Sequence, residues 1–320
     1  MKRTIGILTS GGDAPGMNAA IRAVTRSALA RDFDVYGIYD GYLGLVEGNY
    51  TKFNKGSVSD ILFKGGTILG TARMPEFVED EIMDKAIKQM EKVGMDSLVV
   101  IGGDGTYRGA GDLCRKGISC IGIPGTIDND CPGTDYTIGF HTALNTIVEA
   151  VDKLRDTSAS HHRCSVVQVM GNHCGDLALY SAICCGAEIV VTPEVGFSES
   201  EIIRRLQHFD AIKKHRHALV IVSEKLMDVE ALAEKISETT SFSGRATVLG
   251  HIQRGGSPVP YDRLLASRIG DYAVDLLANG ATNRCVGIKN DQMISTPIAE
   301  ALVQPKEFEQ NLYDMFERLA

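Results

Sequence analysis

Short runs of apolar, β-prone residues alternate with helix-like patterns along almost the whole chain, and this alternation constrains the fold most. The expected strands are Thr4–Leu8, Val35–Tyr39, Leu98–Ile101, Cys120–Ile123, Ser165–Met170, Glu188–Val191, Ala218–Val222, Thr247–Leu249 and Val286–Ile288. The expected helices are Asn18–Ala30, Asp80–Val93, Tyr107–Lys116, Ala143–Arg155, Glu199–Phe209, Val229–Glu238, Tyr261–Ala278 and Glu307–Leu319. This alternation predicts βα units and mostly parallel sheets, in which ligands bind beyond the carboxyl ends of the strands.

The length and charge of the chain narrow the class of protein further. A chain of 320 residues is too long for one ordinary core and suits two domains. No Pro/Ser-rich linker separates them, so the domains are expected to share the chain by crossing back and forth. The formal net charge of −8 argues against a nucleic-acid-binding protein, which would show a basic excess.

The chain is expected to be cytoplasmic. Its first residues are basic and apolar like a signal peptide, but the apolar run is broken at Gly6 and ends at Leu8. No segment approaches the roughly 18 apolar residues of a membrane span. The cysteines form no C-x-x-C pair, which predicts free thiols in a reducing compartment. Cys184 and Cys185 lie in an Ala- and Ile-rich stretch, so both are expected to be buried.

Glycine clusters follow five of the expected strands. They are Ser10-Gly11-Gly12-Asp13, Gly102-Gly103-Asp104-Gly105-Thr106, Pro124-Gly125-Thr126, Gly171 after Met170, and Gly250-His251. One cluster would predict only a turn, but five at the same edge of parallel sheets indicate a ligand-lined cleft. The first cluster opens a helix, where backbone N–H groups can bind phosphate; a tight strand-to-helix turn is the alternative.

Two of these loops carry acidic side chains. Asp104 lies between glycines beside a possible phosphate cradle, which favours a Mg²⁺ site over an Asx turn. Asp128 and Asp130 are two residues apart and would point the same way in an extended stretch. One of them could accept a hydroxyl proton in phosphoryl transfer while the other supports the metal or the fold. A solvated acidic turn is the alternative.

Arginines in or beside loops and helix ends are candidates for phosphate contacts, because a guanidinium binds phosphate bidentately. They are Arg73, Arg155, Arg163, Arg245 and Arg254. His251 stands out together with Arg254, since glycines flank both. Arg22 and Arg26 share one face of the first expected helix, which predicts either a solvated basic face or an anion site.

Together these residues resemble the bacterial-type ATP-dependent 6-phosphofructokinases over essentially the whole chain. The segments that carry the resemblance are Thr9–Arg22, Gly65–Arg73, Val99–Tyr107, Pro124–Phe140, Val248–Arg263 and Arg284–Ile288. The resemblance implies an α/β phosphofructokinase fold of two similar three-layer α/β/α domains with mostly parallel sheets and an active site in the cleft between them. The larger, ATP-binding domain would comprise residues 1–138 and 252–305, and the smaller, sugar-phosphate-binding domain residues 139–251 and 306–320.

The resemblance also implies a reaction and its residues. The γ-phosphoryl group of MgATP would pass to the 1-hydroxyl of fructose 6-phosphate, with Asp128 as general base, Arg73 and Thr126 as catalytic partners, and Asp130 supporting the Mg²⁺ side. The implied ATP-binding residues are Gly12, Arg73, Met74, Gly103, Asp104, Gly105 and Thr106, with Asp104 as the metal ligand. The implied sugar-phosphate residues are Thr126, Ile127, Asp128, Arg163, Met170, Gly171, Asn172, Glu224, Arg245, His251, Ile252, Gln253 and Arg254.

The resemblance further implies a homotetramer in which Arg163 and Arg245 reach the active site of a neighbouring subunit. An allosteric site for ADP or phosphoenolpyruvate would lie between subunits. The residues that match it are Arg22, Arg26, Lys55, Arg155, Gly186, Glu188, Lys213 and His215. The segment Lys213–His217 differs from the family pattern by about one residue, so the effector lysine is assigned only to this segment.

The phosphoryl donor and the rival functions can be weighed on single residues. Pyrophosphate-using relatives carry Asp at the position of Gly105 and Lys at that of Gly125, so the two glycines favour ATP over pyrophosphate. Lipid and NAD kinases share the Gly-Gly-Asp-Gly motif but not the segments around Asp128 and His251. A low-activity regulatory subunit that binds the same ligands is the remaining alternative.

That last alternative rests on Asn172. The family usually has arginine there, and this arginine helps to neutralise charge on the transferring phosphate. Losing such a group often costs a few kcal/mol of transition-state stabilisation, about 3 kcal/mol in measured cases. We therefore expect either a lower turnover or another basic residue, such as His173, in its place.

Overall fold

The computed structural model describes residues 2–213 and 217–320, and the chain divides into two units. Unit 1 comprises Met1–Thr142 and Arg254–Lys306, and unit 2 comprises Ala143–Gln253 and Glu307–Ala320. The chain therefore leaves unit 1 and returns to it. The sequence analysis expected the chain to change domain after residues 138, 251 and 305. In this division it changes unit after residues 142, 253 and 306. In the described part of the chain, no helix is both long and apolar enough to cross a bilayer.

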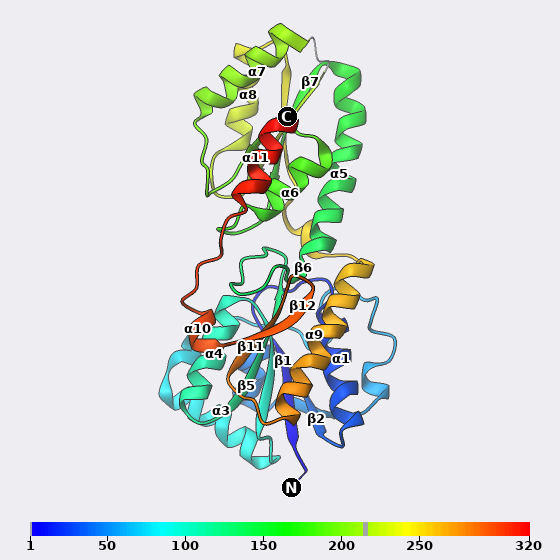
Figure 1. Cartoon of the computed structure of the whole chain (residues 1–320), viewed down its shortest axis with the longest axis vertical. Coiled ribbons are helices and arrows are strands. Elements are labelled where there is room, and N and C mark those ends of the chain that lie inside the picture. Colours follow the sequence, from blue (N-terminus) through cyan, green and yellow to red (C-terminus); the bar gives the residue numbers. More distant parts are fainter. Residues whose placement is uncertain (1, 214–216) are drawn as a thin grey trace. The chain divides into compact units, whose positions relative to one another are not determined.

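Unit 1 is built on an eight-stranded sheet (Figure 1). Its strands are β1 (Thr4–Thr9), β2 (Asp34–Ile38), β3 (Tyr50–Phe53), β4 (Ser97–Gly102), β5 (Ser119–Thr126), β6 (Ile138–Gly139), β11 (Arg284–Lys289) and β12 (Gln292–Pro297). The order is β12-β11-β5-β4-β1-β2-β3, and β6 pairs with β5. Neighbouring strands are parallel except at the two edges of the sheet. There β3 pairs antiparallel with β2, and β12 pairs antiparallel with β11. The central strands β1 and β4 are wholly buried, as expected of a parallel sheet covered on both faces.

Helices cover both faces of this sheet (Figure 1). On one face, α1 (Met17–Ala30) packs against α9 (Pro260–Ala278), and Gly270 allows their close approach because a Cβ there would meet Ala23. The other face carries α2 (Gly41–Glu47), α3 (Asp80–Lys92), α4 (Asp104–Arg115) and α10 (Ile298–Ala301), whose apolar side chains join Leu8, Val100 and their neighbours in one core. Two short 3₁₀ turns, η1 (Gly56–Val58) and η2 (Pro75–Val78), lie in the connections.

Unit 2 has a fully parallel four-stranded sheet in the order β10-β7-β9-β8. The strands are β7 (Arg163–Val169), β8 (Ile189–Val191), β9 (Ala218–Ser223) and β10 (Ser243–Val248). One core joins alternate strand residues to α7 (Glu199–Lys213) and α8 (Val229–Thr239). On the other face lie α5 (Phe140–His161) and α6 (Asp176–Cys185), with α11 (Gln310–Leu319) against α6; η3 (Gly250–Arg254) follows β10.

The predicted α/β class and mostly parallel sheets are confirmed, although the two sheets differ in their number of strands. The sequence patterns did not predict β3, β6, β12, α2, α6 or α10. The expectation that both Cys184 and Cys185 are buried was wrong, because Cys184 is exposed. Successive residues of a helix point about 100° apart, so the two thiols of α6 cannot face the same neighbours.

Candidate active site

The carboxyl ends of three neighbouring strands define one edge of the sheet in unit 1. In the order β5-β4-β1 these strands end at Thr126, Gly102 and Thr9. The loops after β1 and β4 are joined, because Ser10 N donates to Ile101 O at 3.0 Å and Thr106 Oγ1 donates to Ser10 O at 3.0 Å. A Cβ at Gly102 would overlap both Thr106 Oγ1 and Ser10 O, so only glycine permits this junction. The two glycine loops therefore form one continuous backbone surface.

Arg254 packs against the first of these loops. A Cβ at Gly12 would lie 2.5 Å from Arg254 Nη1, and Nη1 donates to the Asp13 carbonyl oxygen at 3.2 Å. The other guanidinium nitrogen, Nη2, lies 3.9 Å from Asp128 Oδ2. The absence of a side chain at Gly12 therefore leaves the space in which the Arg254 guanidinium reaches the acidic loop.

Asp128 follows β5 directly and is buried, with 7% of the residue exposed. Its backbone N donates to Thr126 Oγ1 at 3.2 Å, and that hydroxyl lies 3.4 Å from Asp128 Oδ2. The carboxylate thus has a hydroxyl on one side and the Arg254 guanidinium on another. A buried carboxylate held in this way is suited to accept a proton from a bound hydroxyl group.

Asn129 fixes the shape of this loop, and the sequence analysis did not identify it. It is fully buried with a φ of 54°, its Oδ1 accepts from Thr137 N at 2.9 Å, and its Nδ2 donates to Asp135 O at 3.1 Å. Asn tolerates the left-handed region, which is the one signal the sequence offered. The expectation of an extended stretch in which Asp128 and Asp130 point the same way was wrong, because the chain turns at Asn129.

Asp104 opens α4, and its carboxylate is bound by Arg108 four residues later. Arg108 Nε and Nη2 donate to Asp104 Oδ2 at 2.9 Å and 2.7 Å. The Asp104 side chain is 41% exposed, and a Cβ at Gly105 would meet nothing within 4 Å. One accessible carboxylate beside open space suits Mg²⁺ carried on phosphate oxygens, which needs only one or two protein carboxylates. Among the residues described, no three His, Cys, Asp or Glu side chains are grouped for a metal ion.

The other predicted ATP residues lie in the loop before η2. Arg73 is exposed, whereas Met74 is half-buried and packs against the unit 1 core together with Phe77. The predicted nucleotide-binding residues, from Gly12 through Thr106, all belong to unit 1.

The predicted sugar-phosphate residues divide between the units. Thr126, Ile127, Asp128 and Arg254 belong to unit 1, and the rest belong to unit 2. At the carboxyl edge of the unit 2 sheet, Met170 N donates to Oε1 of the fully buried Gln253 at 3.1 Å. Asn172 N donates to Glu224 Oε1 at 2.9 Å, so the turns after β7 and β9 are joined. His251 and Ile252 are exposed on η3. Gly171 lies in the same turn.

Arg163 and Arg245 lie elsewhere in unit 2. Arg163 is the first residue of β7, and Arg245 pairs with Ser165, so both lie near the amino end of that strand. At about 3.3 Å per residue, Arg163 is about 20 Å along the strand from the Val169 end, where Met170 and Gly171 follow. Arg163 donates to Thr157 Oγ1 at 3.2 Å, and Arg245 to Gly244 O at 2.7 Å. Within unit 2, therefore, these two arginines do not join the other predicted substrate residues.

The predicted effector residues are also divided. Arg22 and Arg26 lie on α1 and Lys55 precedes η1, all in unit 1. In unit 2, Gly186 directly follows α6, and a Cβ there would lie 3.9 Å from Arg155 Nη2. Glu188 Oε2 accepts from Leu219 N at 2.7 Å. Lys213 ends α7, and His215 lies outside the described residues.

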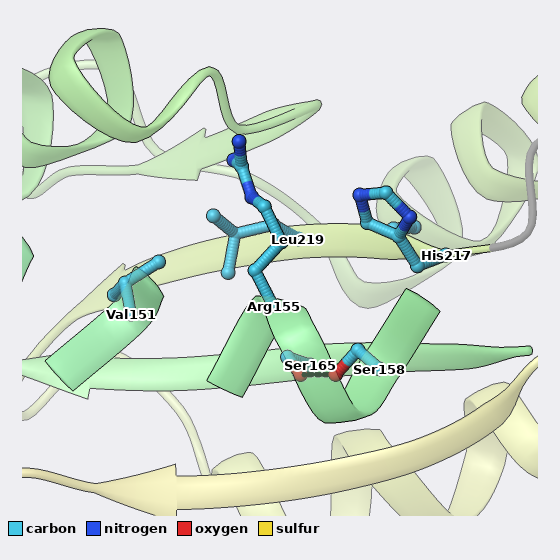
Figure 2. A pocket seen from close by; sticks show the side chains of 7 residues that line it. Val151, Arg155, Ser158, Ser165, His217 and Leu219 are labelled. Carbon is cyan, nitrogen blue, oxygen red and sulfur yellow. Dashed lines mark hydrogen bonds between the residues drawn. The ribbon is translucent and has the colours of Figure 1, made fainter. Parts of the chain in front are cut away.

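A pocket in unit 2 contains Arg155 (Figure 2). Val151, Arg155 and Ser158 reach it from α5, Leu219 from β9, and His217 from the position just before β9. Ser158 and Ser165 also line the pocket, and their Oγ atoms are hydrogen-bonded to each other at 2.7 Å. The sequence analysis did not assign His217 to the effector residues, and the structure brings it into the same pocket as Arg155.

The carboxyl edge of this parallel sheet carries glycine loops, the buried carboxylate of Asp128 and the accessible carboxylate of Asp104. This arrangement is typical of α/β proteins that bind phosphate groups. The family model described as phosphofructokinase matches residues 4–277. Two relatives, named ATP-dependent 6-phosphofructokinase and from Vibrio campbellii and Vibrio parahaemolyticus, are each 54% identical over 321 residues and are covered over 100% of both chains. The chain belongs to the phosphofructokinase family.

Solved structures agree with this assignment. A phosphofructokinase from Saccharomyces cerevisiae matches 100% of this chain with a TM-score of 0.88 and 34% identity. This chain spans about half of the yeast chain, 48% of its length. A Pichia pastoris phosphofructokinase in the T-state matches with a TM-score of 0.88, 37% identity and 37% of its own chain. A pyrophosphate-dependent phosphofructokinase from Marinobacter aquaeolei has a TM-score of 0.87 over 99% of this chain at 20% identity, which shows the shared fold.

Proposed function

We propose that this chain is an ATP-dependent 6-phosphofructokinase, which transfers the γ-phosphoryl group of MgATP to the 1-hydroxyl of fructose 6-phosphate. The products are fructose 1,6-bisphosphate and ADP. The observation that carries the proposal is the surrounding of Asp128, which is buried beside the Thr126 hydroxyl and the Arg254 guanidinium. The full-length relatives named for this activity support the same choice.

In this proposal each residue has a physical task. The backbone N–H groups of the glycine loops hold the phosphates of ATP at the helix N-termini, where the partial positive charge favours anions. Asp104 holds the Mg²⁺ that arrives with ATP, which when bound offsets the phosphate charge. Asp128 accepts the proton of the attacking hydroxyl group, and Thr126 and Arg73 orient the transferring group.

The proposal extends to the assembly. Arg163 and Arg245 lie near the amino end of β7, away from Met170 and Glu224, which supports a role in the active site of a neighbouring subunit. A homotetramer with shared active sites, and an effector site for ADP or phosphoenolpyruvate that includes Arg155, are parts of this proposal. A cytoplasmic location is a further part.

ATP is the favoured donor, and the two glycines support it differently. A side chain at Gly105 would enter open space beside Asp104, so its absence leaves room there for a larger donor. At Gly125 a Cβ would lie 2.9 Å from Ile101 Cγ2 and 3.2 Å from Met17 Cε, so packing alone requires glycine. The argument for ATP over pyrophosphate therefore rests on Gly105.

A coupled assay tests the proposal. Formation of fructose 1,6-bisphosphate is followed with fructose 6-phosphate and Mg²⁺, with ATP in one arm and pyrophosphate in the other. We expect turnover with ATP at least 100-fold faster than with pyrophosphate, by analogy with other large specificity ratios. Comparable rates, or turnover with pyrophosphate alone, would contradict the assignment of the donor. Binding of both ligands without turnover would favour the regulatory subunit.

A further inference from the structure

Two left-handed turns meet at the carboxyl edge of the sheet in unit 2. Asn172 follows β7 with a φ of 58°, and Lys225 follows β9 with a φ of 68°. Lys225 Nζ donates to Asn172 Oδ1 at 2.7 Å, and Asn172 N donates to Glu224 Oε1 at 2.9 Å. Glu224 N in turn donates to Val169 O at 2.8 Å. The side chain of Lys225 is thus directed to the Met170–Asn172 turn by its own contact with Asn172 and by the contacts of the preceding residue, Glu224.

The charges at this edge make the position of Lys225 significant. Glu224 accepts from Asn172 N, and Glu194 Oε1 accepts from Gly175 N at 2.9 Å, so two carboxylates stand at the turns after β7. Asn172 itself carries no charge. A sugar phosphate or nucleotide phosphate approaching such an edge would meet repulsion, unless a cation offsets the carboxylates. The ammonium group of Lys225 lies on the turn where that cation is needed.

We propose that Lys225, held in place by Asn172, supplies the positive charge that stabilises the phosphoryl oxygens of substrate bound at this edge. This inference rests on the proposed function and adds a residue to it. The ammonium group is exposed and sits on a flexible stem, so it can leave Asn172 Oδ1 for a phosphoryl oxygen without breaking a buried contact. A charge-assisted hydrogen bond of this kind is shorter and stronger than the one that it replaces.

Substitution at the pair tests the inference. Lys225→Met removes the charge and keeps an unbranched stem, and Lys225→Arg keeps the charge. The double variant Asn172→Arg with Lys225→Met moves the charge from one turn to the other. Lys235→Met is the matched control. Lys235 is also exposed in unit 2, but it lies on α8 and pairs with Glu199 of α7. His173→Gln tests the other basic side chain near the turn.

The readouts are kcat and KM for fructose 6-phosphate with ATP. We expect Lys225→Met to lower kcat/KM for fructose 6-phosphate about tenfold, because one charge-assisted contact to the phosphoryl oxygens is lost. Lys225→Arg and the double variant should stay within threefold of the wild-type kcat/KM, and His173→Gln and Lys235→Met within twofold. Unchanged kcat/KM in Lys225→Met, or a double variant with a kcat/KM as low as that of Lys225→Met, would overturn the inference.

The two proposals fail separately. If the wild-type protein shows no transfer from ATP or pyrophosphate, the proposed function fails. If the wild-type protein is active and Lys225→Met equals it, only the role of Lys225 fails. Lys225 is exposed, so the far-ultraviolet circular dichroism and the melting temperature of Lys225→Met should match the wild-type values.

Discussion

The carboxylate of Asp262 accepts two hydrogen bonds from Thr142, one from the backbone N at 2.8 Å and one from Oγ1 at 2.6 Å. Its second oxygen accepts from Gly139 N at 3.0 Å. Asp262 is fully buried near the start of α9, and Thr142 ends the first segment of unit 1. This cluster therefore joins the two chain segments that build unit 1.

Asp262→Ala is expected to destabilise the protein by about 3 kcal/mol, because three donors lose their acceptor and buried unsatisfied groups are costly. The free energy of unfolding from a urea titration measures this. Thr142→Ser keeps the hydroxyl group and should cost less than about 1 kcal/mol. Equal losses in the two variants would show that the hydrogen bonds of Asp262 are not the source of the effect.

Burial raises the pKa of Asp262 from 3.8 to about 6, although hydrogen bonds from Thr142 and Gly139 oppose the shift. The folded state then binds this proton more tightly than the unfolded state. The resulting stability is fully present below pH 4 and is lost as the pH rises toward 6. Asp262→Asn lacks this dependence.

The free energy of unfolding of wild type relative to Asp262→Asn should therefore fall by about 2 kcal/mol between pH 4 and pH 7. Urea titrations of both proteins across this range measure the difference. A difference that stays constant with pH would show that Asp262 titrates at the same pH in both states.

Arg108 forms an ion pair with Asp104 at 2.7 Å, so under the proposed function it would compete with Mg²⁺ for this carboxylate. Exposed ion pairs contribute up to about 1 kcal/mol, so Arg108→Ala should lower the Mg²⁺ concentration for half-maximal activity by up to about fivefold. A Mg²⁺ titration at saturating ATP measures this. Arg115→Ala is the control, because Arg115 pairs with Asp112 at the other end of α4 and should change nothing. A higher Mg²⁺ requirement in Arg108→Ala would mean that Arg108 assists the metal or the nucleotide.

Gly12→Ala should displace Arg254, since the new Cβ would lie 2.5 Å from Arg254 Nη1. We expect kcat/KM for fructose 6-phosphate to fall at least about tenfold as the guanidinium moves away from Asp128. Arg254→Lys should lose a similar factor, because a lysine cannot contact both Asp13 and the acidic loop. Wild-type activity in Gly12→Ala would show that the position of Arg254 is not critical.

Much of the fold was predictable because β1, β4 and β5 are largely apolar runs with glycine at or just after their carboxyl ends. β12 was missed because Gln292–Pro297 holds few apolar residues and is only half-buried at the sheet edge. α2 contains Gly41 and Gly44, which weaken helix propensity, and its helix depends on packing of Tyr42 and Leu45 in the core. α6 is apolar on all sides, so its sequence shows no helical period.

The candidate site was predictable to a different degree. Residues within one loop, such as Asp104 and Asp128, could be proposed from the sequence because their chemistry and spacing are local. The contacts of Lys225 with Asn172 and of Arg254 with Gly12 join segments far apart in the chain, so no spacing revealed them. The distance of Arg163 from Met170 along β7 likewise depends on the position of the strand ends.

The role of Asp128 is the centre of this account, and one variant tests it most directly. Asp128→Asn keeps the size of the side chain and removes the base, so kcat with fructose 6-phosphate and MgATP should fall at least about 100-fold. The dissociation constant for ATP, measured by calorimetry, should stay within about threefold of wild type. A variant that retains kcat within severalfold of wild type would contradict the assignment of Asp128 as the general base.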